Sequence, residues 1–491
     1  MRSFTIYLRS HPYIIAISLI AIIQISIILI FDFNGYFGQD SYEYLKTTRE
    51  LITFYKGGIL PSYSVFPGMY PFICSLIGLV IPNTLFVLQF VSILSLLISY
   101  ILLRKIAIMI YKTDNNIDVY LFSFFALSPY ILRFGIISMS DLSGIVLWLT
   151  TLYLSLLFQS RGKLKFLLFA CLFGGFAVMT RYTAIVILLM PAVICIKQIL
   201  KQKKYHYFLI ALLFFSLGSL PDYLLRGRFF FWELKNNGNA FPYFYFVDQY
   251  SISNVFKRDF QNLDGLQNYQ YPNIIHVMQV FIHPAFIFVG TLFLIFIRKK
   301  YLLIKELQLA LLTTLIYLLF LAGNAYQSNR YLMFVLPLIL LFYYGAFLEI
   351  TSRINFRNSK KILIILIICS IQLFLFIYSF KTTLEMNRNE KAITRDISKL
   401  PEGSTIYTFS INGALTAYIP TINIYDIYLN KVEDLSINNG YFLFNYESFS
   451  KQFEGLLPME NYQFINSNYE LKTVSKFENG WEIYQIISLT K

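Results

Sequence analysis

Long uncharged runs separated by short polar segments occupy most of the first 380 residues of the chain. A helix needs about 20 apolar residues to cross a bilayer, so these runs predict transmembrane helices. The predicted spans, about eleven of them, are Tyr13–Phe31, Leu85–Leu103, Val119–Leu132, Leu142–Ser160, Phe166–Thr180, Thr183–Ile196, Tyr205–Leu220, Ile275–Ile297, Leu307–Leu321, Tyr331–Leu348 and Ile362–Phe380. Prolines divide the stretch before the second span, where Pro67–Val80 is expected to be a partly embedded segment.

The composition agrees with a membrane protein. The chain is 57% apolar and only 14% charged, whereas soluble domains carry roughly 25% charged residues. A net charge of +14 would suggest nucleic acid in a soluble chain. Here the basic residues gather in short loops between spans, as cytoplasmic loops do, so no nucleic-acid partner is expected. Their bias predicts a cytoplasmic N-terminus.

The pattern changes after residue 380. Charged residues become frequent, and short alternating runs replace the long apolar ones. Eleven spans place residues 381–491 outside the cytoplasm as a small soluble α/β domain, with a capping or docking role preferred over a catalytic one. Its expected elements are a helix at Thr383–Leu400, strands at Ser404–Phe409 and Tyr441–Asn445, and a hairpin of Tyr469–Phe477 with Trp481–Ile487 turning at Asn479-Gly480.

Three predicted spans are too short to cross the whole bilayer core, so their outer ends should lie below the membrane surface. Those ends carry Arg133, Asp141 and Arg181. A charge at membrane depth is unfavourable and by default marks a site or a polar cavity. For Arg133 the alternative is that the side chain extends to the lipid headgroups.

The first outer loop adds two acids. Asp40 and Glu43 lie three apart in Gly38–Tyr44, and they share one helix face if Ser41–Tyr55 is helical with Ser41 as its cap. A lone loop acid is usually just solvated. In this chain, however, the predicted topology places Asp40 on the same membrane face as Asp141, Arg181 and Arg330.

Carboxylates and arginines on one face suit the transfer of a sugar from a lipid phosphate. A carboxylate can accept the proton that the attacking hydroxyl loses. Arginine stabilises the leaving phosphate, because its planar fork binds phosphate oxygens through two hydrogen bonds. Two carboxylates such as Asp40 and Asp141 can also bind Mg²⁺ or Mn²⁺.

Four stretches resemble the GT-C glycosyltransferases, polytopic membrane enzymes that use polyprenyl-phosphate sugars. The chain is most similar to the glycosyltransferase family 39-like group, which includes protein mannosyltransferases and the lipid A aminoarabinose transferase. The matching stretches are Asp40–Tyr44, Phe66–Pro71, Ser138–Asp141, and the pair Gly174–Arg181 with Arg330–Pro337.

The resemblance implies roles for matching residues. Asp40 corresponds to the family's catalytic acid/base, and Arg181 to a donor-phosphate residue, with Arg330 as a second. Asp141 matches an acid that lies by the metal or phosphate in some members, so it is a secondary candidate. Glu43, on the same predicted helix face as Asp40, is a further secondary acid or possible metal ligand. Many members have a second acid directly after the first-loop Asp, where this chain has Ser41, which leaves metal dependence open. Two neighbours in sequence, Tyr42 and Tyr182, are expected to line the substrate site.

The sequence therefore predicts a mainly α, polytopic GT-C-type membrane domain (residues 1–380, with outer loops at about 32–66 and 221–274) and an extracytoplasmic α/β domain. The predicted activity is an inverting transfer of a monosaccharide from a polyprenyl phosphate to a lipid, glycan or protein acceptor at the outer face. The alternatives are a glycan polymerase or ligase using a lipid-diphosphate oligosaccharide, and a non-enzymatic lipid or polysaccharide transporter. The sugar and the acceptor stay open.

Overall fold

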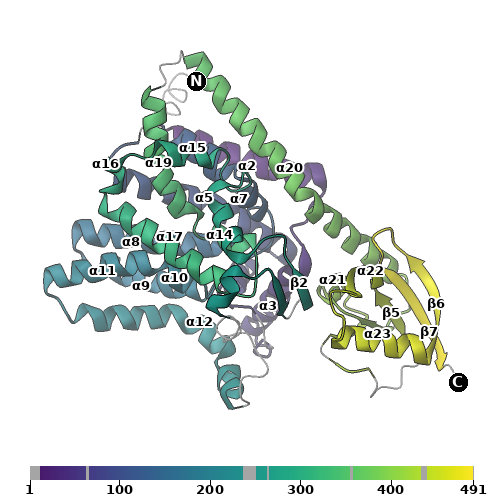
Figure 1. Cartoon of the computed structure of the whole chain (residues 1–491). Helices are drawn as coiled ribbons and strands as arrows, with labels where there is room; N and C mark the ends of the chain where they lie inside the picture. Colours follow the sequence, from purple (N-terminus) through teal and green to yellow (C-terminus); the bar gives the residue numbers. More distant parts are fainter. Residues whose placement is uncertain are drawn as a thin grey trace. The chain divides into compact units, whose positions relative to one another are not determined.

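The computed structural model describes residues 11–61, 66–114, 116–235, 250–262, 265–353, 358–428, 430–432 and 440–489. The fold is mainly helical (Figure 1). The chain divides into two compact units. The first, here the membrane unit, contains residues 1–35, 47–255 and 273–381. The second, here the sheet unit, contains residues 36–46, 256–272 and 382–491.

Five helices in the described part of the chain are long and apolar enough to cross a membrane, which agrees with a multi-pass membrane protein. They are α2 (Pro12–Phe31), α5 (Thr84–Tyr111), α8 (Asp141–Arg161), α17 (Lys305–Ala322) and the first part of α20 (Asn358–Ile397). The other helical elements of the membrane unit are α4 (Met69–Gly78), α6 (Ile117–Leu121), η1 (Phe122–Ala126), α7 (Pro129–Phe134), α9 (Leu164–Val178), α10 (Ala184–Ile187), α11 (Leu189–Gln202), α12 (Tyr207–Lys235), η2 (Ile252–Phe256, which ends in the sheet unit), α14 (Asn273–Ile282), α15 (Gly290–Phe296), α16 (Lys299–Leu302), α18 (Asn329–Met333) and α19 (Leu336–Arg353).

Several predicted spans are not continuous helices, and this corrects the sequence analysis. The span expected at Val119–Leu132 is divided into α6, the π-helical turn η1 and α7, because Pro129 cannot donate a backbone hydrogen bond. The spans expected at Thr183–Ile196, Ile275–Ile297 and Tyr331–Leu348 are each two helices. In contrast, α12 continues through Pro221 to Lys235, although the outer loop was expected to begin at 221. The remainder of that loop lies partly outside the described residues.

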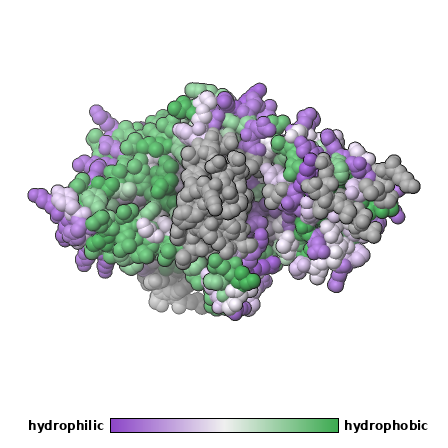
Figure 2. Space-filling model, turned by 90° about the horizontal axis from the view of Figure 1, so that it is seen from below, coloured by the Kyte–Doolittle hydropathy of each residue, from purple (hydrophilic) through white to green (hydrophobic). Residues whose placement is uncertain are grey.

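Small residues let the helices of the membrane unit approach closely. Gly175 of α9 and Gly218 of α12 face each other, and a Cβ at either position would collide with the partner helix backbone. The apolar face turned outward is broad (Figure 2). On α12, Leu209 is 74% exposed and Leu212 64%, and on α2 Leu29 is 74% exposed. Such side chains suit a surface that contacts lipid.

The sheet unit contains a mixed five-stranded sheet in the order β4-β3-β5-β7-β6. Its strands are β3 (Thr405–Thr408), β4 (Asn423–Asp426), β5 (Tyr441–Phe444), β6 (Tyr469–Lys476) and β7 (Glu482–Leu489). The predicted hairpin is the antiparallel pair β6–β7, and the two predicted single strands are β3 and β5, which pair in parallel. Sequence reasoning missed β4 and three helices: α21 (Asn412–Tyr418), α22 (Tyr446–Phe449) and α23 (Leu457–Asn468).

Two segments that the sequence analysis assigned to outer loops belong to the sheet unit. Residues 256–272 carry a small hairpin, β1 (Asp259–Asn262) with β2 (Gly265–Asn268). Residues 36–46 include the start of α3 (Gly38–Tyr55). The predicted helix is present, but it begins before Ser41. Ser41 is therefore not its cap, and its hydroxyl donates instead to the Phe37 carbonyl at 2.9 Å.

Candidate functional site

Three of the predicted site residues meet inside the membrane unit. Asp141 begins α8, Arg181 lies between α9 and α10, and Arg330 belongs to α18. Arg181 Nη2 is 2.7 Å from Asp141 Oδ1, and Arg330 Nη2 is 3.1 Å from Asp141 Oδ2. The Asp141 side chain is fully buried, whereas those of Arg181 and Arg330 are 10% and 22% exposed. A buried carboxylate thus fixes two guanidinium groups that stay partly accessible.

Aromatic rings and a third arginine surround this charge cluster. Arg181 lies 5.2 Å from the centre of the Tyr331 ring, and Arg330 lies 5.9 Å from that of Phe134. Arg133, at 5.5 Å, shares the Phe134 ring with Arg330. Three guanidinium groups thus lie close to one carboxylate in a partly apolar setting, where electrostatic attraction is strong. The arrangement suits a bound anion such as a phosphate.

Asp222 is a buried acid that the sequence analysis did not select. It lies in α12 directly after Pro221 and is 2% exposed. Its carboxylate accepts a hydrogen bond from the Gly68 backbone N–H at 2.6 Å and another from the Tyr182 hydroxyl at 3.2 Å. Asp222 therefore ties the proline-rich segment before α4 to the residue next to Arg181. The signal was present in the sequence, as a lone acid at the end of an apolar run.

Tyr182 and Tyr42, both expected to line the substrate site, have protein partners for their hydroxyls. Tyr182 is half-buried and donates to Asp222. Tyr42, in the sheet unit, is 3% exposed, and its hydroxyl donates to Glu390 Oε2 at 2.6 Å. The contact of either tyrosine with substrate stays a prediction.

Asp40 lies in the first turn of α3, and Glu43 follows three residues later in the same helix, as expected. Both side chains are half-buried. Nearby Tyr42 and Ser41 are both buried, so Asp40 is more accessible than the residues that follow it.

Glu390 is a second buried acid that the sequence analysis did not select. It belongs to α20, ten residues after the uncharged run ends at Phe380, in the part of the helix that lies in the sheet unit and outside the membrane-crossing stretch. Burial raises the pKa of Glu390 from 4.5 to about 7, although hydrogen bonds from Tyr42 and the Gly38 backbone act to lower it.

A divalent metal fits the charge cluster poorly. Mg²⁺ and Mn²⁺ prefer oxygen ligands, but both Asp141 oxygens are paired with arginines, whose positive charge repels a cation. Throughout the described ranges, no group of three or more His, Cys, Asp or Glu side chains is arranged to hold a metal ion.

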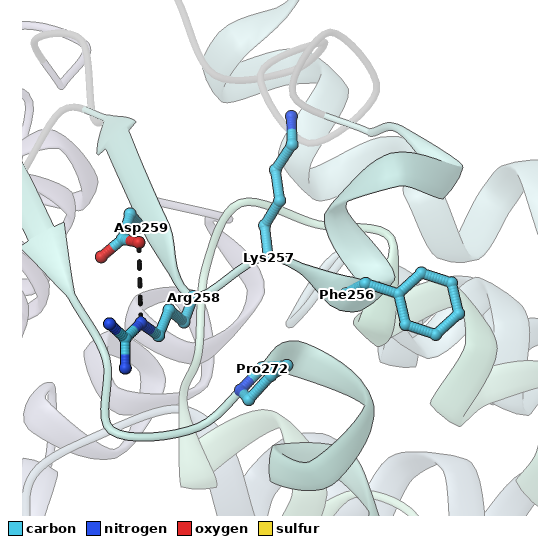
Figure 3. Close-up of a pocket in the computed structure, with 5 residues that line it drawn as sticks. All are labelled: Phe256, Lys257, Arg258, Asp259 and Pro272. Carbon is cyan, nitrogen blue, oxygen red and sulfur yellow. Dashed lines mark ion pairs between the residues drawn. The ribbon is translucent and has the colours of Figure 1, made fainter.

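A cavity of about 630 Å³ lies in the sheet unit beside β1 and is lined by Phe256, Lys257, Arg258, Asp259 and Pro272 (Figure 3). Arg258 and Asp259 face each other at 3.7 Å, but both side chains are more than half exposed. An exposed ion pair of this kind contributes little binding energy. The charge cluster around Asp141 is the stronger candidate site.

Comparison with known protein families gives one match. Residues 66–218, which include Asp141 and Arg181, match the model of a family described as dolichyl-phosphate-mannose-protein mannosyltransferase. No curated protein sequence gave a significant match.

Solved structures show the same fold over nearly the whole chain. ArnT from Cupriavidus metallidurans bound to undecaprenyl phosphate has a TM-score of 0.57 at 12% identity, and the match covers 94% of this chain and 97% of ArnT. The apo structure of the same ArnT gives a TM-score of 0.55, with the same identity and coverage. The predicted resemblance is thereby confirmed: the chain has the fold of the GT-C membrane glycosyltransferases, and part of its membrane unit matches their mannosyltransferase family.

Proposed function

We propose that this protein is a glycosyltransferase that moves a sugar from a polyprenyl-phosphate donor to an acceptor hydroxyl at the outer face of the membrane. The observation that carries the proposal is the pairing of Arg181 and Arg330 with the fully buried Asp141. It is supported by the fold shared with ArnT, a protein solved with undecaprenyl phosphate, and by the family match over the segment that holds Asp141 and Arg181.

In the proposed reaction, Arg181 and Arg330 bind the donor phosphate, and Arg133 adds to the positive field. The acceptor oxygen attacks the anomeric carbon while the bond from that carbon to the phosphate oxygen breaks. The bonding electrons leave with the phosphate, whose growing charge the arginines stabilise. One displacement of this kind inverts the anomeric centre.

Asp40 is the proposed base. Its carboxylate takes the proton from the acceptor hydroxyl as the new glycosidic bond forms. Glu43, one helical turn later, is a secondary acid. The proposed setting is a bacterial inner membrane with the N-terminus in the cytoplasm and residues 381–491 outside.

The test is transfer from a panel of radiolabelled polyprenyl-phosphate sugars by the purified full chain in nanodiscs, with lipid, glycan and peptide acceptors. We expect the wild type to use one donor. Asp40→Asn should lower turnover by about 10² to 10⁴, because an amide cannot accept the proton. Glu402→Gln, at an exposed turn, is the control. Undiminished turnover by folded Asp40→Asn would refute the role of Asp40.

The same panel separates the alternatives. A diphosphate-linked oligosaccharide as the only donor would indicate a polymerase or ligase. Lipid binding without transfer to any acceptor would favour a transporter, and export assays would follow.

A further inference from the structure

Residues 36–42, which carry the proposed base Asp40, are attached to the C-terminal part of α20 and to α21 by a buried polar network. The Tyr42 hydroxyl donates to Glu390 at 2.6 Å, and the Gly38 backbone N–H donates to the same carboxylate. Asn387, one turn earlier on α20, donates from its side-chain amide to the Tyr36 carbonyl at 2.8 Å. Glu390 and Asn387 are 8% and 2% exposed.

A second set of contacts comes from α21. The Gly413 backbone N–H donates to Gln39 Oε1 at 3.0 Å. A Cβ on Gly413 would lie 2.6 Å from the Tyr42 Cβ, so only glycine allows this approach. The Tyr42 ring is stacked on Tyr36 with centroids 5.3 Å apart and contacts Tyr418 edge-on at 6.0 Å.

These contacts hold the residues on both sides of Asp40. Gln39 and Tyr42 are anchored, while Asp40 itself stays half-buried. A fully satisfied buried network is rigid, and a buried carboxylate whose donors were removed would be strongly disfavoured. An apolar contact would be enough for docking alone. Hydrogen bonds to a buried glutamate instead hold the first turn of the helix that carries Asp40, as the orientation of its carboxylate would require.

We propose that Glu390 is a positioning residue: from the sheet unit, it fixes the first turn of α3 so that Asp40 is oriented for proton transfer. This inference rests on the proposed function, since it assigns to the C-terminal region a part in the same reaction. Glu390 acts through Tyr42 and Gly38 and does not contact the donor.

The activity test compares Glu390→Gln and Tyr42→Phe with matched controls, Glu402→Gln and Tyr446→Phe, at exposed positions of the same unit. We expect each test variant to lower kcat about tenfold with the KM for donor unchanged within twofold. The double variant should be no slower than the slower single one, because both changes weaken the same interaction. Wild-type kcat in both single variants, or additive losses in the double variant, would overturn the proposal.

A second measurement does not depend on turnover. Hydrogen–deuterium exchange of the full chain should show faster exchange in residues 36–46 for Glu390→Gln and Tyr42→Phe than for the two controls. Unchanged exchange there would overturn the positioning role. If the wild type transfers no sugar but exchange increases as expected, the proposed function fails while the structural attachment stands. If one variant does not fold, the other carries both measurements.

Discussion

Two buried carboxylates, Asp141 in the membrane unit and Glu390 in the sheet unit, have opposite surroundings. Asp141 is paired with two arginines, so its charge is balanced by cations. Glu390 receives hydrogen bonds from a tyrosine and a backbone N–H, which are neutral donors. An acid among cations stays charged and orders them, whereas an acid among neutral donors loses hydration without gaining a counter-charge. The comparison separates the proposed anion-binding site from the proposed support for a helix.

Removal of the Asp141 charge should have the largest effect. Asp141→Asn leaves Arg181 and Arg330 close together without their counter-ion, and breaking a buried ion pair costs about 3–5 kcal/mol. We expect a markedly lower apparent melting temperature in nanodiscs and no detectable donor binding. Asp396→Asn, whose partner Lys399 is largely exposed, is the control. A variant as stable as wild type would contradict a structural ion pair at Asp141.

Replacement of the arginines by lysine should separate charge from geometry. Lysine keeps the charge but loses the planar fork that binds two phosphate oxygens. We expect Arg181→Lys to raise the KM for donor about tenfold, and the more exposed Arg330→Lys to raise it less. Steady-state kinetics over a range of donor concentrations measures both. Equal donor KM in wild type and both variants would exclude these arginines from phosphate binding.

The pH dependence of stability should report on the surroundings of Glu390. Because the pKa of Glu390 is raised in the folded protein from 4.5 to about 7, its contribution is complete below pH 4.5 and is lost as the pH rises through 7. Glu390→Gln does not titrate. Its stability relative to wild type should therefore increase by roughly 2 kcal/mol between pH 5 and pH 8.

Melting temperatures of wild type, Glu390→Gln and Glu402→Gln at pH 5 and pH 8 measure this change. The difference between Glu402→Gln and wild type should not depend on pH. If the difference in melting temperature between Glu390→Gln and wild type is also independent of pH, then Glu390 titrates normally and its carboxyl group is not shielded from water.

The smallest effect is expected from metal removal. Since arginines occupy both oxygens of Asp141, extensive dialysis against EDTA should change transfer by less than twofold. Loss of turnover that Mg²⁺ or Mn²⁺ restores would show that the acids of this protein do bind a metal during the reaction, and would make the arginine pairing at Asp141 a resting arrangement.

How well the sequence predicted each element of the fold depended on the sequence pattern that the prediction used. The long apolar helices α5 and α8 lie where uncharged runs of span length predicted them, because apolar length alone decides that class of helix. The breaks within the Val119–Leu132 and Ile275–Ile297 spans were not predicted. A short apolar run has the same hydropathy pattern whether it forms one helix or two, and contacts with neighbouring helices decide where it breaks.

The candidate site was predicted as a set of residue types but not as a set of contacts. Asp141 and Arg181 were selected because charges at membrane depth are unfavourable without a function. Arg330 was selected because it was expected on the same membrane face, just before the predicted span Tyr331–Leu348. Asp222 was not selected, although it also follows an apolar run, because an acid next to Pro221 resembles the start of a loop. Only its hydrogen bonds to Gly68 and Tyr182 show that it lies inside the fold.

The sequence by itself determined that this chain is a multi-pass membrane protein and that it resembles the GT-C glycosyltransferases, since hydropathy and local motifs are properties of neighbouring residues. Only the tertiary structure paired Arg330 with Asp141 across 189 residues and Tyr42 with Glu390 across 348. Contacts at such separations depend on the path of the whole chain, which no local pattern records. The long-range contacts therefore decided which acids are bound by cations and which support the helix that carries Asp40.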